Sequence, residues 1–181
     1  MVRVLGMETD TVPQLPDSAN HDPPRDSFET FYVASADRVY RALAVTLGDV
    51  HLAREATDEA MARAFVRWRQ VAGCDNPGGW VFRVGLNWAT SWRRKLRREA
   101  VLPENERGMP TVALPEPAGV DAEAALALLP MPARAVVVCR ILFDLSTAET
   151  AAVLRIAEGT VRSRLSRAMT ALRRELSEEY R

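Results

Sequence analysis

The sequence predicts an all-α protein made of two small helical domains joined by an extended linker. Apolar residues recur every three or four positions in several long segments, which is the spacing of one face of an α-helix. Aromatic residues, which favour strands, make up only 7% of the chain. A Pro- and Gly-rich stretch at 100–120 carries no such period and divides the 181 residues into two parts.

The first predicted domain covers residues 26–99 and contains three helices. The first helix starts near Ser27 and runs to Gly48, and the second runs from about Asp49 to Val71. A cluster of helix-breaking residues at 73–79 predicts a loop. The third helix begins near Pro77, because proline suits the first turn of a helix, and continues to about Glu99. The first helix has its apolar side at Phe28, Phe31, Tyr32, Val39, Leu43 and Leu47.

Two proline-rich segments lie outside the helical pattern. Residues 1–25 are predicted to be a disordered leader, with Met7 as an alternative start of the chain. Residues 100–120 are predicted to be an extended linker and a domain boundary. A linker of about 21 residues can span up to about 70 Å when extended, at about 3.3 Å per residue.

The second predicted domain covers residues 121–181 and ends in a helix-turn-helix. Helices are expected at 122–129, 132–143, 146–154 and from Glu158 to about Glu179. Ser146 and Glu149 have the spacing of a capping box, in which each side chain bonds the other's backbone N–H. The three residues Arg155–Ala157 form a tight turn. A short helix, a tight turn and a basic second helix are typical of a helix-turn-helix.

The last helix has one apolar stripe and one polar, basic face. The stripe consists of Val161, Leu165, Ala168 and Leu172. Between Arg155 and Arg174 there are six cations and a single acid, whereas a solvated surface helix usually mixes both signs. A recognition helix places its N-terminal residues against base edges and its flanking cations against phosphates. DNA binding is therefore favoured over a merely solvated face.

The helix at 80–98 repeats this arrangement. Its apolar side begins at Trp80, and its polar side holds Asn87 among arginines. The segment contains six cations and no acid, although the whole chain has a formal net charge of zero. Cations attract phosphate regardless of sequence, and amide and hydroxyl groups add hydrogen bonds. Nucleic acid is the favoured partner, and an acidic protein surface is the alternative.

Several classes of function are not supported by the sequence. No stretch approaches the roughly 20 apolar residues of a membrane span, and the N-terminus lacks the features of a secretory signal, so we expect no membrane association and a cytoplasmic location. Cys74 and Cys139 are far apart, and neither His21 nor His51 has a partner at metal-ligand spacing. We find no phosphate loop and no nucleophile–base pair. We therefore expect no metal, no cofactor, no small-molecule substrate and no enzymatic activity.

Three segments resemble the sigma-70 family of RNA polymerase sigma factors, and in particular its extracytoplasmic-function (ECF) group. ETAAVLRIAEGTVRSRLSRAMTAL, starting at Glu149, resembles sigma region 4. NPGGWVFRVGLNWATSWRRKLRR, starting at Asn76, resembles regions 2.3–2.4, and EATDEAMARAFVRW resembles region 2.2. The resemblance covers about 26–99 and 121–178. The absence of intervening regions 1.1 and 3 is typical of the ECF group.

The resemblance implies a sigma factor that binds core RNA polymerase through its clamp and flap regions and directs promoter recognition and DNA melting. Residues 26–99 would be region 2 and residues 121–181 region 4. Contacts with the −10 element are implied for Arg67, Val71, Asn76, Arg83, Val84, Asn87, Thr90, Ser91, Arg94 and Arg97. Contacts with the −35 element are implied for Glu158, Thr160, Arg162, Ser163, Arg164 and Arg167. Contacts with the polymerase are implied for Glu55, Asp58, Glu59 and Arg63.

The sequence departs from the family pattern at three positions. Arg155 stands where the turn usually has Gly, Ala157 where Ser is frequent, and Asp58 where Gln is frequent. An anti-sigma factor is an expected partner, on the resemblance and on an apolar surface expected around Ala56, Ala60 and Met61. One alternative is an ordinary helix-turn-helix regulator with an N-terminal dimerisation or sensing domain. An enzyme acting on nucleic acid is a third hypothesis, for which no catalytic set is apparent.

Overall fold

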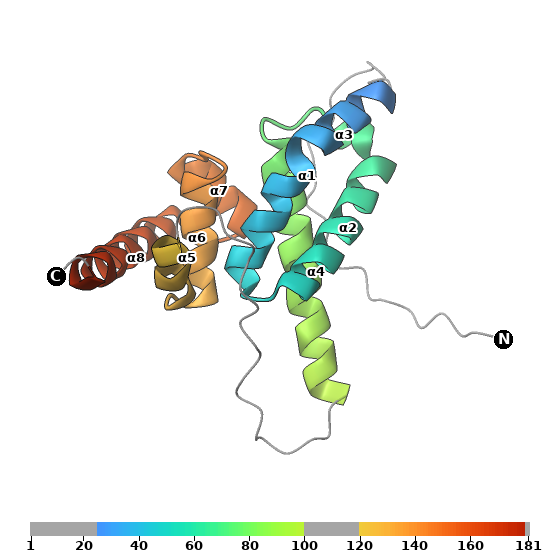
Figure 1. Ribbon diagram of the computed structural model, residues 1–181. Coiled ribbons are helices and arrows are strands. Elements are labelled where there is room, and N and C mark those ends of the chain that lie inside the picture. The colour runs from blue at the N-terminus through green and yellow to red at the C-terminus, as the bar shows by residue number, and fades with distance from the viewer. Residues whose placement is uncertain (1–24, 100–119, 180–181) are drawn as a thin grey trace.

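The computed structural model describes residues 25–99 and 120–179, and within these ranges all regular structure is helical. Helices α1–α4 form one group, the first domain, and α5–α8 form a second group beside it, the second domain (Figure 1). The predicted all-α fold of two helical domains is confirmed. The predicted leader, except for Arg25, and the predicted linker, except for Val120, lie outside the described residues. No helix in the described ranges is long and apolar enough to cross a membrane.

The first two helices form an antiparallel pair around a tight turn. α1 spans Arg25–Leu47 and α2 spans Val50–Val66. Gly48 has a φ of +64°, a left-handed conformation that glycine adopts without steric cost, and it ends α1 as predicted. The Asp49 carboxylate caps α2 by accepting a 2.9 Å hydrogen bond from the backbone N–H of Leu52.

The predicted second helix is wrong in one respect, because it is interrupted at Arg67. There the backbone has φ −112° and ψ 21°, and a separate short helix, α3, follows over Trp68–Val71. The change of direction brings the Trp68 ring to 5.3 Å from Phe28 and 4.9 Å from Phe31, measured between ring centroids. Packing of these aromatic rings stabilises the bend, and local helix propensity does not prevent it.

The third predicted helix is confirmed as α4, which spans Pro77–Glu99. The side-chain oxygen of Asn76 accepts a 2.6 Å hydrogen bond from the N–H of Gly79 and so satisfies one donor of the first turn. A Cβ atom on Gly85 would lie 2.8 Å from Leu43 Cδ1 and 3.0 Å from the Ala56 carbonyl oxygen. The absence of a side chain at Gly85 therefore permits the close approach of α4 to α1 and α2.

The second domain ends in the predicted helix-turn-helix. Its helices are α5 (Val120–Ala127), α6 (Met131–Ile141), α7 (Thr147–Leu154) and α8 (Glu158–Glu179). The capping box of Ser146 and Glu149 is present at the start of α7, with both reciprocal hydrogen bonds formed. Arg155 ends α7 in the left-handed conformation, with φ 53°, which explains why glycine suits this position of the turn.

The two domains pack directly against each other, mainly through α1 and α6 and through α4 and α7. Four buried residues of the second domain, namely Val138, Cys139, Phe143 and Leu145, belong to the same hydrophobic core as α1, α2 and α4. The Phe143 ring lies 5.3 Å from the Phe82 ring, and the Arg38 guanidinium lies 5.4 Å from its centroid. Cys139 is fully buried, as predicted, and burial raises the pKa of its thiol to about 12.

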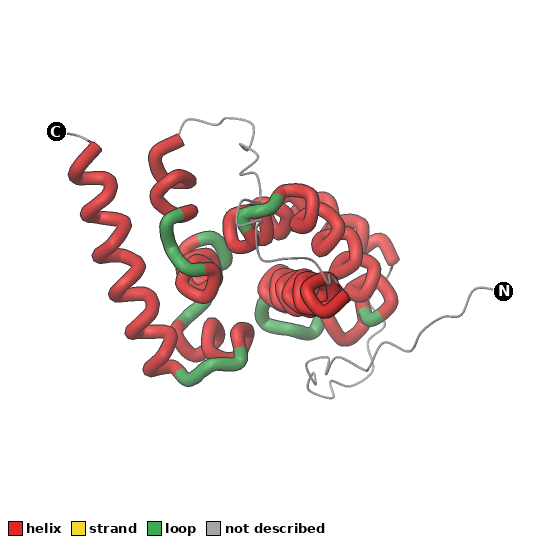
Figure 2. Tube along the Cα trace, turned by 90° about the horizontal axis from the view of Figure 1, so that it is seen from below, coloured by secondary structure: helices red, strands yellow, loops and turns green. Residues whose placement is uncertain are grey.

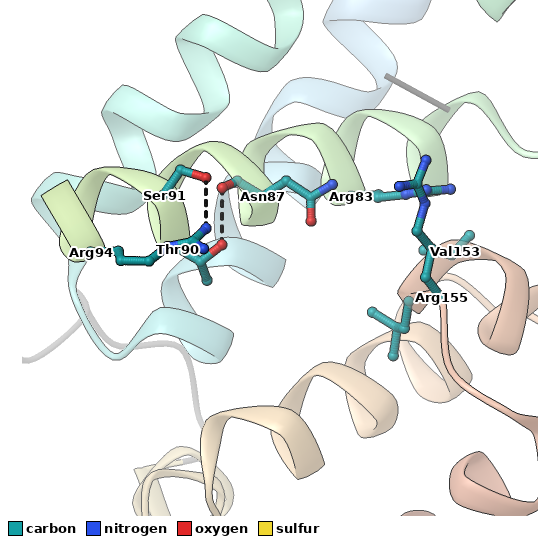
Figure 3. A pocket seen from close by; sticks show the side chains of 8 residues that line it. Arg83, Asn87, Thr90, Ser91, Arg94, Val153 and Arg155 are labelled. Carbon is teal, nitrogen blue, oxygen red and sulfur yellow. Dashed lines mark hydrogen bonds between the residues drawn. The ribbon is translucent and has the colours of Figure 1, made fainter. Parts of the chain in front are cut away.

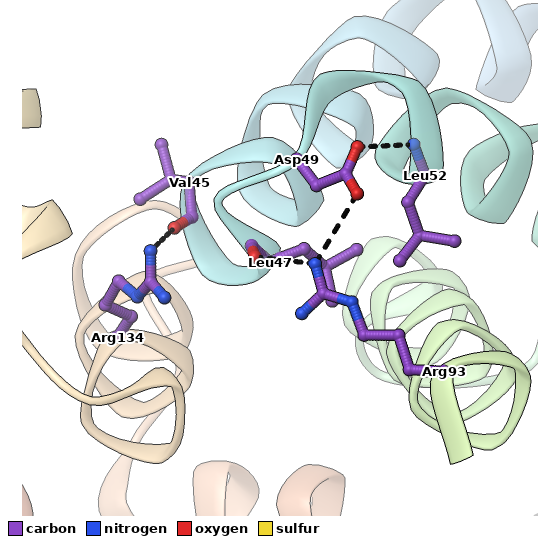
Figure 4. A network of polar contacts seen from close by, with 6 residues as sticks. All are labelled: Val45, Leu47, Asp49, Leu52, Arg93 and Arg134. Atoms are coloured by element: carbon purple, nitrogen blue, oxygen red, sulfur yellow. Dashed lines mark hydrogen bonds and ion pairs between the residues drawn. The ribbon is translucent and has the colours of Figure 1, made fainter. Parts of the chain in front are cut away.

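Two arginines bond the carbonyl groups at the end of α1 (Figure 4). Arg93 of α4 donates to the Leu47 carbonyl at 3.0 Å and lies 3.6 Å from the Asp49 carboxylate. Arg134 of α6 donates to the Val45 carbonyl at 3.1 Å. Burial, and then the nearby charge of Arg93, lower the pKa of Arg134. Cations at a helix C-terminus satisfy orphan carbonyls and favour the helix dipole, so Arg134 ties the second domain to α1.

Candidate nucleic-acid interface

One side of α4 carries a polar, basic surface, and α7 covers part of it. Five of the residues implied for the −10 element line one open pocket, together with three residues at the end of α7 (Figure 3). The pocket has a volume of about 240 Å³. The lining residues are Arg83, Asn87, Thr90, Ser91 and Arg94 from α4 and Val153, Leu154 and Arg155 from the second domain. These residues include three arginines and no acid, so the pocket favours the binding of an anion.

Hydrogen bonds hold several of these side chains in place. The Thr90 hydroxyl lies 2.8 Å from the Leu86 carbonyl and 2.9 Å from the Asn87 carbonyl. Arg94 donates to the Ser91 hydroxyl at 3.4 Å. Arg83 donates to the carbonyl of Ala152 in α7 at 3.3 Å. The last bond crosses between the domains.

The other five residues implied for the −10 element do not line this pocket. Val71 and Val84 are 0% and 5% exposed, so in this conformation they support the site from the core and present no surface to a base. Asn76 caps α4, and its amide also lies 3.4 Å from the Phe143 carbonyl. Arg67 lies at the junction of α2 and α3, and Arg97 is exposed near the end of α4.

The residues implied for the −35 element all lie in the first three turns of α8, which forms one edge of the molecule in Figure 2. Val161 is 0% exposed and Ala168 is 2% exposed, so the predicted apolar stripe faces the second domain's own core. The polar side carries Glu158, Ser163, Arg162 and Arg167, which are exposed, and Thr160 and Arg164, which are half-buried. Arg162 pairs with Glu158 at 3.1 Å. The Arg167 Nε–H donates to the Ser163 carbonyl at 3.1 Å.

The residues implied for polymerase binding lie on the outer side of α2. Glu55 and Asp58 are exposed, and Glu59 pairs with Arg63 at 2.7 Å. The apolar surface expected around Ala56, Ala60 and Met61 is not present: their exposures are 0%, 0% and 3%. They face inward because α1 and α4 both pack against this side of α2.

Sequence reasoning missed the residues that join the two domains. Phe143, Arg134 and the end of α7 all contact the first domain. Phe143 follows α6 directly and carries no motif, and Arg134 is one arginine among many. Only their partners, which are more than 50 residues away in sequence, reveal what they do.

The fold and the two basic helices define a helical DNA-binding protein with a C-terminal helix-turn-helix. The family profile "Sigma-70, region 4" matches residues 120–172. Among curated proteins, the chain is 32% identical to the RNA polymerase sigma-E factor of Streptomyces coelicolor over 159 residues, which is 82% of this chain and 85% of that protein. It is 34% identical over 138 residues to the ECF RNA polymerase sigma factor SigL of Mycobacterium tuberculosis, which is 72% of this chain and 78% of that protein.

Two solved structures support the same fold. The sigma factor RpoE from Bartonella quintana, in complex with the anti-sigma factor NepR, matches with a TM-score of 0.68 at 21% identity, covering 84% of this chain and 98% of that chain. CnrH, in complex with the cytosolic domain of CnrY, matches with a TM-score of 0.54 at 20% identity, covering 86% and 90%. The chain belongs to the ECF group of RNA polymerase sigma factors. It is a sigma factor that directs transcription initiation.

Proposed function

We propose that α4 binds the −10 element of the promoter and that the start of α8 reads the −35 element. The observation that carries the proposal is the presence of two separate basic, hydrogen-bonding helix faces on a chain with no net charge. This division assigns residues 26–99 to region 2, residues 100–120 to a linker and residues 121–181 to region 4.

In the first domain, the pocket face of α4 is the proposed contact with the separated −10 strand. Exposing an unstacked base costs a few kcal/mol, which protein contacts must offset. Arg83 and Arg94 supply cations on this face, and Asn87 supplies an amide that can bond a base edge. Arg67, Val71, Asn76, Val84 and Arg97 flank or support the face.

In the second domain, the exposed side of α8 is the proposed reader of duplex DNA. An α-helix fits the major groove, where each base pair presents a distinct pattern of donors and acceptors. Thr160, Ser163 and Arg167 lie along the proposed groove-facing stripe. Glu158, Arg162 and Arg164 lie at its start and flanks, where the arginines can contact phosphates.

We also propose that Glu55, Asp58, Glu59 and Arg63 on α2 contact the clamp of core RNA polymerase and that the second domain contacts its flap. These four side chains are the polar outer side of a helix whose inner side is fully packed. The chain would act without a cofactor or catalytic activity of its own, in the cytoplasm, where core polymerase acts on the chromosome.

An anti-sigma factor is a proposed partner. Both solved structures named above are complexes, RpoE with the anti-sigma factor NepR and CnrH with the cytosolic domain of CnrY. For this chain, the partner would have to cover the basic face of α4 or the outer side of α2. The buried positions Ala56, Ala60 and Met61 give no support to the apolar docking surface expected there.

The alternative of an ordinary helix-turn-helix regulator accounts for the second domain alone. The match to the S. coelicolor sigma-E factor covers 82% of this chain, which is more than that domain. A regulator would bind its site as a dimer without polymerase, so gel filtration and DNA binding by the purified chain separate the two hypotheses.

Transcription in vitro with purified core polymerase tests the proposal. Promoters are selected from a DNA library by the holoenzyme, and the triple variant Arg83→Ala/Asn87→Ala/Arg94→Ala is compared with the wild-type chain. Arg54→Ala, at an exposed position on α2 whose guanidinium lies over the Tyr40 ring, is the control for the loss of one surface arginine. We expect the triple variant to lose transcription and the control to retain it. Tight, sequence-specific binding by the free chain together with no polymerase-dependent transcription contradicts the proposal.

A further inference from the structure

The turn of the helix-turn-helix carries an arginine in a backbone conformation that disfavours any side chain. Arg155 has φ 53° and ψ 49°, in the left-handed region. An L-residue in this region brings its Cβ close to the following carbonyl oxygen, and glycine avoids that contact. Gly48 adopts the same region at the end of α1, with a φ of +64°. A glycine would form the turn at Arg155 without strain, so the backbone does not account for an arginine at this position.

The Arg155 side chain contributes instead to the pocket beside α4. It lines this pocket together with Arg83 and Asn87. Figure 3 shows the Arg155 side chain extending from the turn toward Arg83. Arg83 is held from α7, because it donates a 3.3 Å hydrogen bond to the Ala152 carbonyl. Two guanidinium groups of like charge therefore meet at one end of the pocket, and no acid is among the residues that line it.

This end of the pocket presents hydrogen-bond donors that suit an acceptor from outside the chain. The Arg83 Nε is buried and has no hydrogen-bond partner in the described part of the chain. A buried donor without an acceptor costs free energy. The Asn87 amide, one helical turn further along α4, adds two N–H donors. An oxyanion at this point would accept from the arginines and offset the repulsion between their charges.

The volume and the donors of the pocket indicate the kind of anion. Pockets for drug-sized ligands have volumes of about 300–1,000 Å³. This pocket, at about 240 Å³, is smaller and suits a compact group better than a whole nucleotide. The planar fork of N–H groups on a guanidinium matches the oxygens of a phosphate. Two neighbouring guanidinium groups can each bond one phosphate of a diphosphate.

We propose that the end of the pocket formed by Arg83 and Arg155 is a binding site for a small anion that carries a diphosphate group. Asn87 completes the site with its amide, and the turn before α8 supplies Arg155 at the expense of a strained backbone. The inference uses the pocket as it lies in the structure and does not require that α4 binds DNA.

Isothermal titration calorimetry with inorganic pyrophosphate tests the site in the free, full-length chain. Sulfate at the same ionic strength, about 150 mM, is the reference anion. Arg155→Gly removes the cation and keeps a residue that suits the left-handed turn. Arg83→Lys keeps the charge at that position but removes the fork and the Nε–H.

Arg94→Ala is the matched control, because it removes one arginine from the other end of the same pocket. Arg94 lies about 16 Å along α4 from Arg83, at 1.5 Å per residue. This distance exceeds the Debye length of about 8 Å at 150 mM ionic strength, so the charge of Arg94 should contribute little to binding at the proposed site.

We expect the wild-type chain to bind one pyrophosphate, at least about tenfold more tightly than sulfate. Arg155→Gly and Arg83→Lys should each weaken pyrophosphate binding by roughly tenfold or more, and Arg94→Ala by less than about threefold. Circular dichroism should show unchanged helix content in all three variants. If Arg155→Gly loses helix content, Arg83→Lys decides the question by itself.

Three results overturn the inference. The first is the absence of saturable pyrophosphate binding by the wild-type chain. The second is equal binding of pyrophosphate and sulfate. The third is an equal loss of affinity in Arg155→Gly and Arg94→Ala, which would mean that the whole basic face attracts anions without a defined site.

Phosphate groups also occur in the DNA backbone, so a single-stranded deoxythymidine pentamer is the second probe. A pentamer that binds through Arg155, with no binding of pyrophosphate, assigns these donors to DNA and overturns the inference. Neither titration uses polymerase or a promoter. A holoenzyme that selects no promoter therefore contradicts the proposed function and leaves the pyrophosphate result standing. A chain that drives transcription but does not bind pyrophosphate loses only this site.

Discussion

Gly85 provides a direct test of how α4 is positioned. Its missing side chain lets α4 approach α1 and α2, and it lies two residues before Asn87 in the same helix. Replacing a helical glycine by alanine normally stabilises a helix by about 1 kcal/mol. Here the added Cβ would lie 2.8 Å from Leu43 Cδ1 and 3.0 Å from the Ala56 carbonyl oxygen. The leucine methyl can move, but the carbonyl belongs to the backbone of α2 and cannot move without shifting that helix.

The expected magnitude follows from these two opposing effects. Overpacking in a well-packed core costs about 1–3 kcal/mol, so Gly85→Ala should be destabilising by up to about 2 kcal/mol after the helix gain is subtracted. Gly159, in the first turn of α8, is the matched control, because a Cβ there meets nothing within 4 Å. Gly159→Ala should be stabilising by up to about 1 kcal/mol.

Thermal unfolding followed by circular dichroism at 222 nm compares the two variants. For a chain of this length, 1 kcal/mol corresponds to about 2–4 °C in Tm. The Tm of Gly85→Ala should therefore lie roughly 2–12 °C below that of Gly159→Ala. An equal rise in Tm for both variants would refute the close approach of α4 to α2, and with it the placement of the pocket face described above.

Three further predictions concern the proposed sites. Asn87→Ala should impair strand opening more than promoter recruitment, because a neutral amide adds hydrogen bonding and no charge; permanganate footprinting measures the opening, and unchanged melting removes Asn87 from the site. Arg162→Ala or Arg164→Ala should weaken holoenzyme binding to all −35 sequences alike and should reduce the slope of log K against log salt concentration by about one unit. Arg167→Ala should instead cost about 1–3 kcal/mol of binding free energy on the preferred −35 sequence and reduce the difference in affinity between −35 sequences. The opposite pattern would mean that α8 is rotated. Hydrogen bonds with Ser146 at the N-cap of α7 lower the pKa of Glu149 from its ordinary value of 4.5. The ionised carboxylate therefore stabilises the fold above pH 4.5, and this stabilisation is lost as the pH falls through the lowered pKa of the folded state. The Tm difference between wild type and Glu149→Gln should be present at pH 7 and should shrink as the pH is lowered below 4.5; a difference independent of pH would exclude the charge as its cause.

Local sequence rules predicted most of the helices because their signals lie within a few residues. Ser146 and Glu149 gave the start of α7, and Pro77 gave the start of α4. The four-residue stripe beginning at Val161 gave the buried side of α8. These features depend on hydrogen bonds and contacts within one or two helical turns, which a single sequence displays directly.

Features that depend on distant partners were missed. The bend at Arg67 is stabilised by Trp68 packing on rings more than 30 residues earlier in the chain. Helical periodicity identifies an apolar side of α2 but does not say whether another helix covers it, so Ala56 was expected at the surface and is fully buried. For the same reason, the resemblance that implied a base contact for Val84 could not show that this side chain is part of the core.

The chemistry of the domain contact predicts how salt should act on the free chain. The interactions described above as joining the domains are apolar packing around Phe143, a cation–π contact from Arg38 and hydrogen bonds to backbone carbonyls, such as that from Arg134 to Val45. Contacts of this kind depend little on ionic strength, whereas each phosphate contact loses affinity steeply as salt rises. The arginines that line the shared pocket repel one another, and salt screens this repulsion, which slightly favours the contact between the two domains. The radius of gyration of the free chain should therefore stay constant or fall between about 50 and 500 mM NaCl. Over the same range, binding of the free chain to single-stranded DNA should weaken, with a slope of log K against log salt concentration of about −0.7 per phosphate contact. Scattering and anisotropy measured across the same salt series check this, and an expansion of the chain at high salt would mean that ion pairs, and not the Phe143 cluster, hold the domains together.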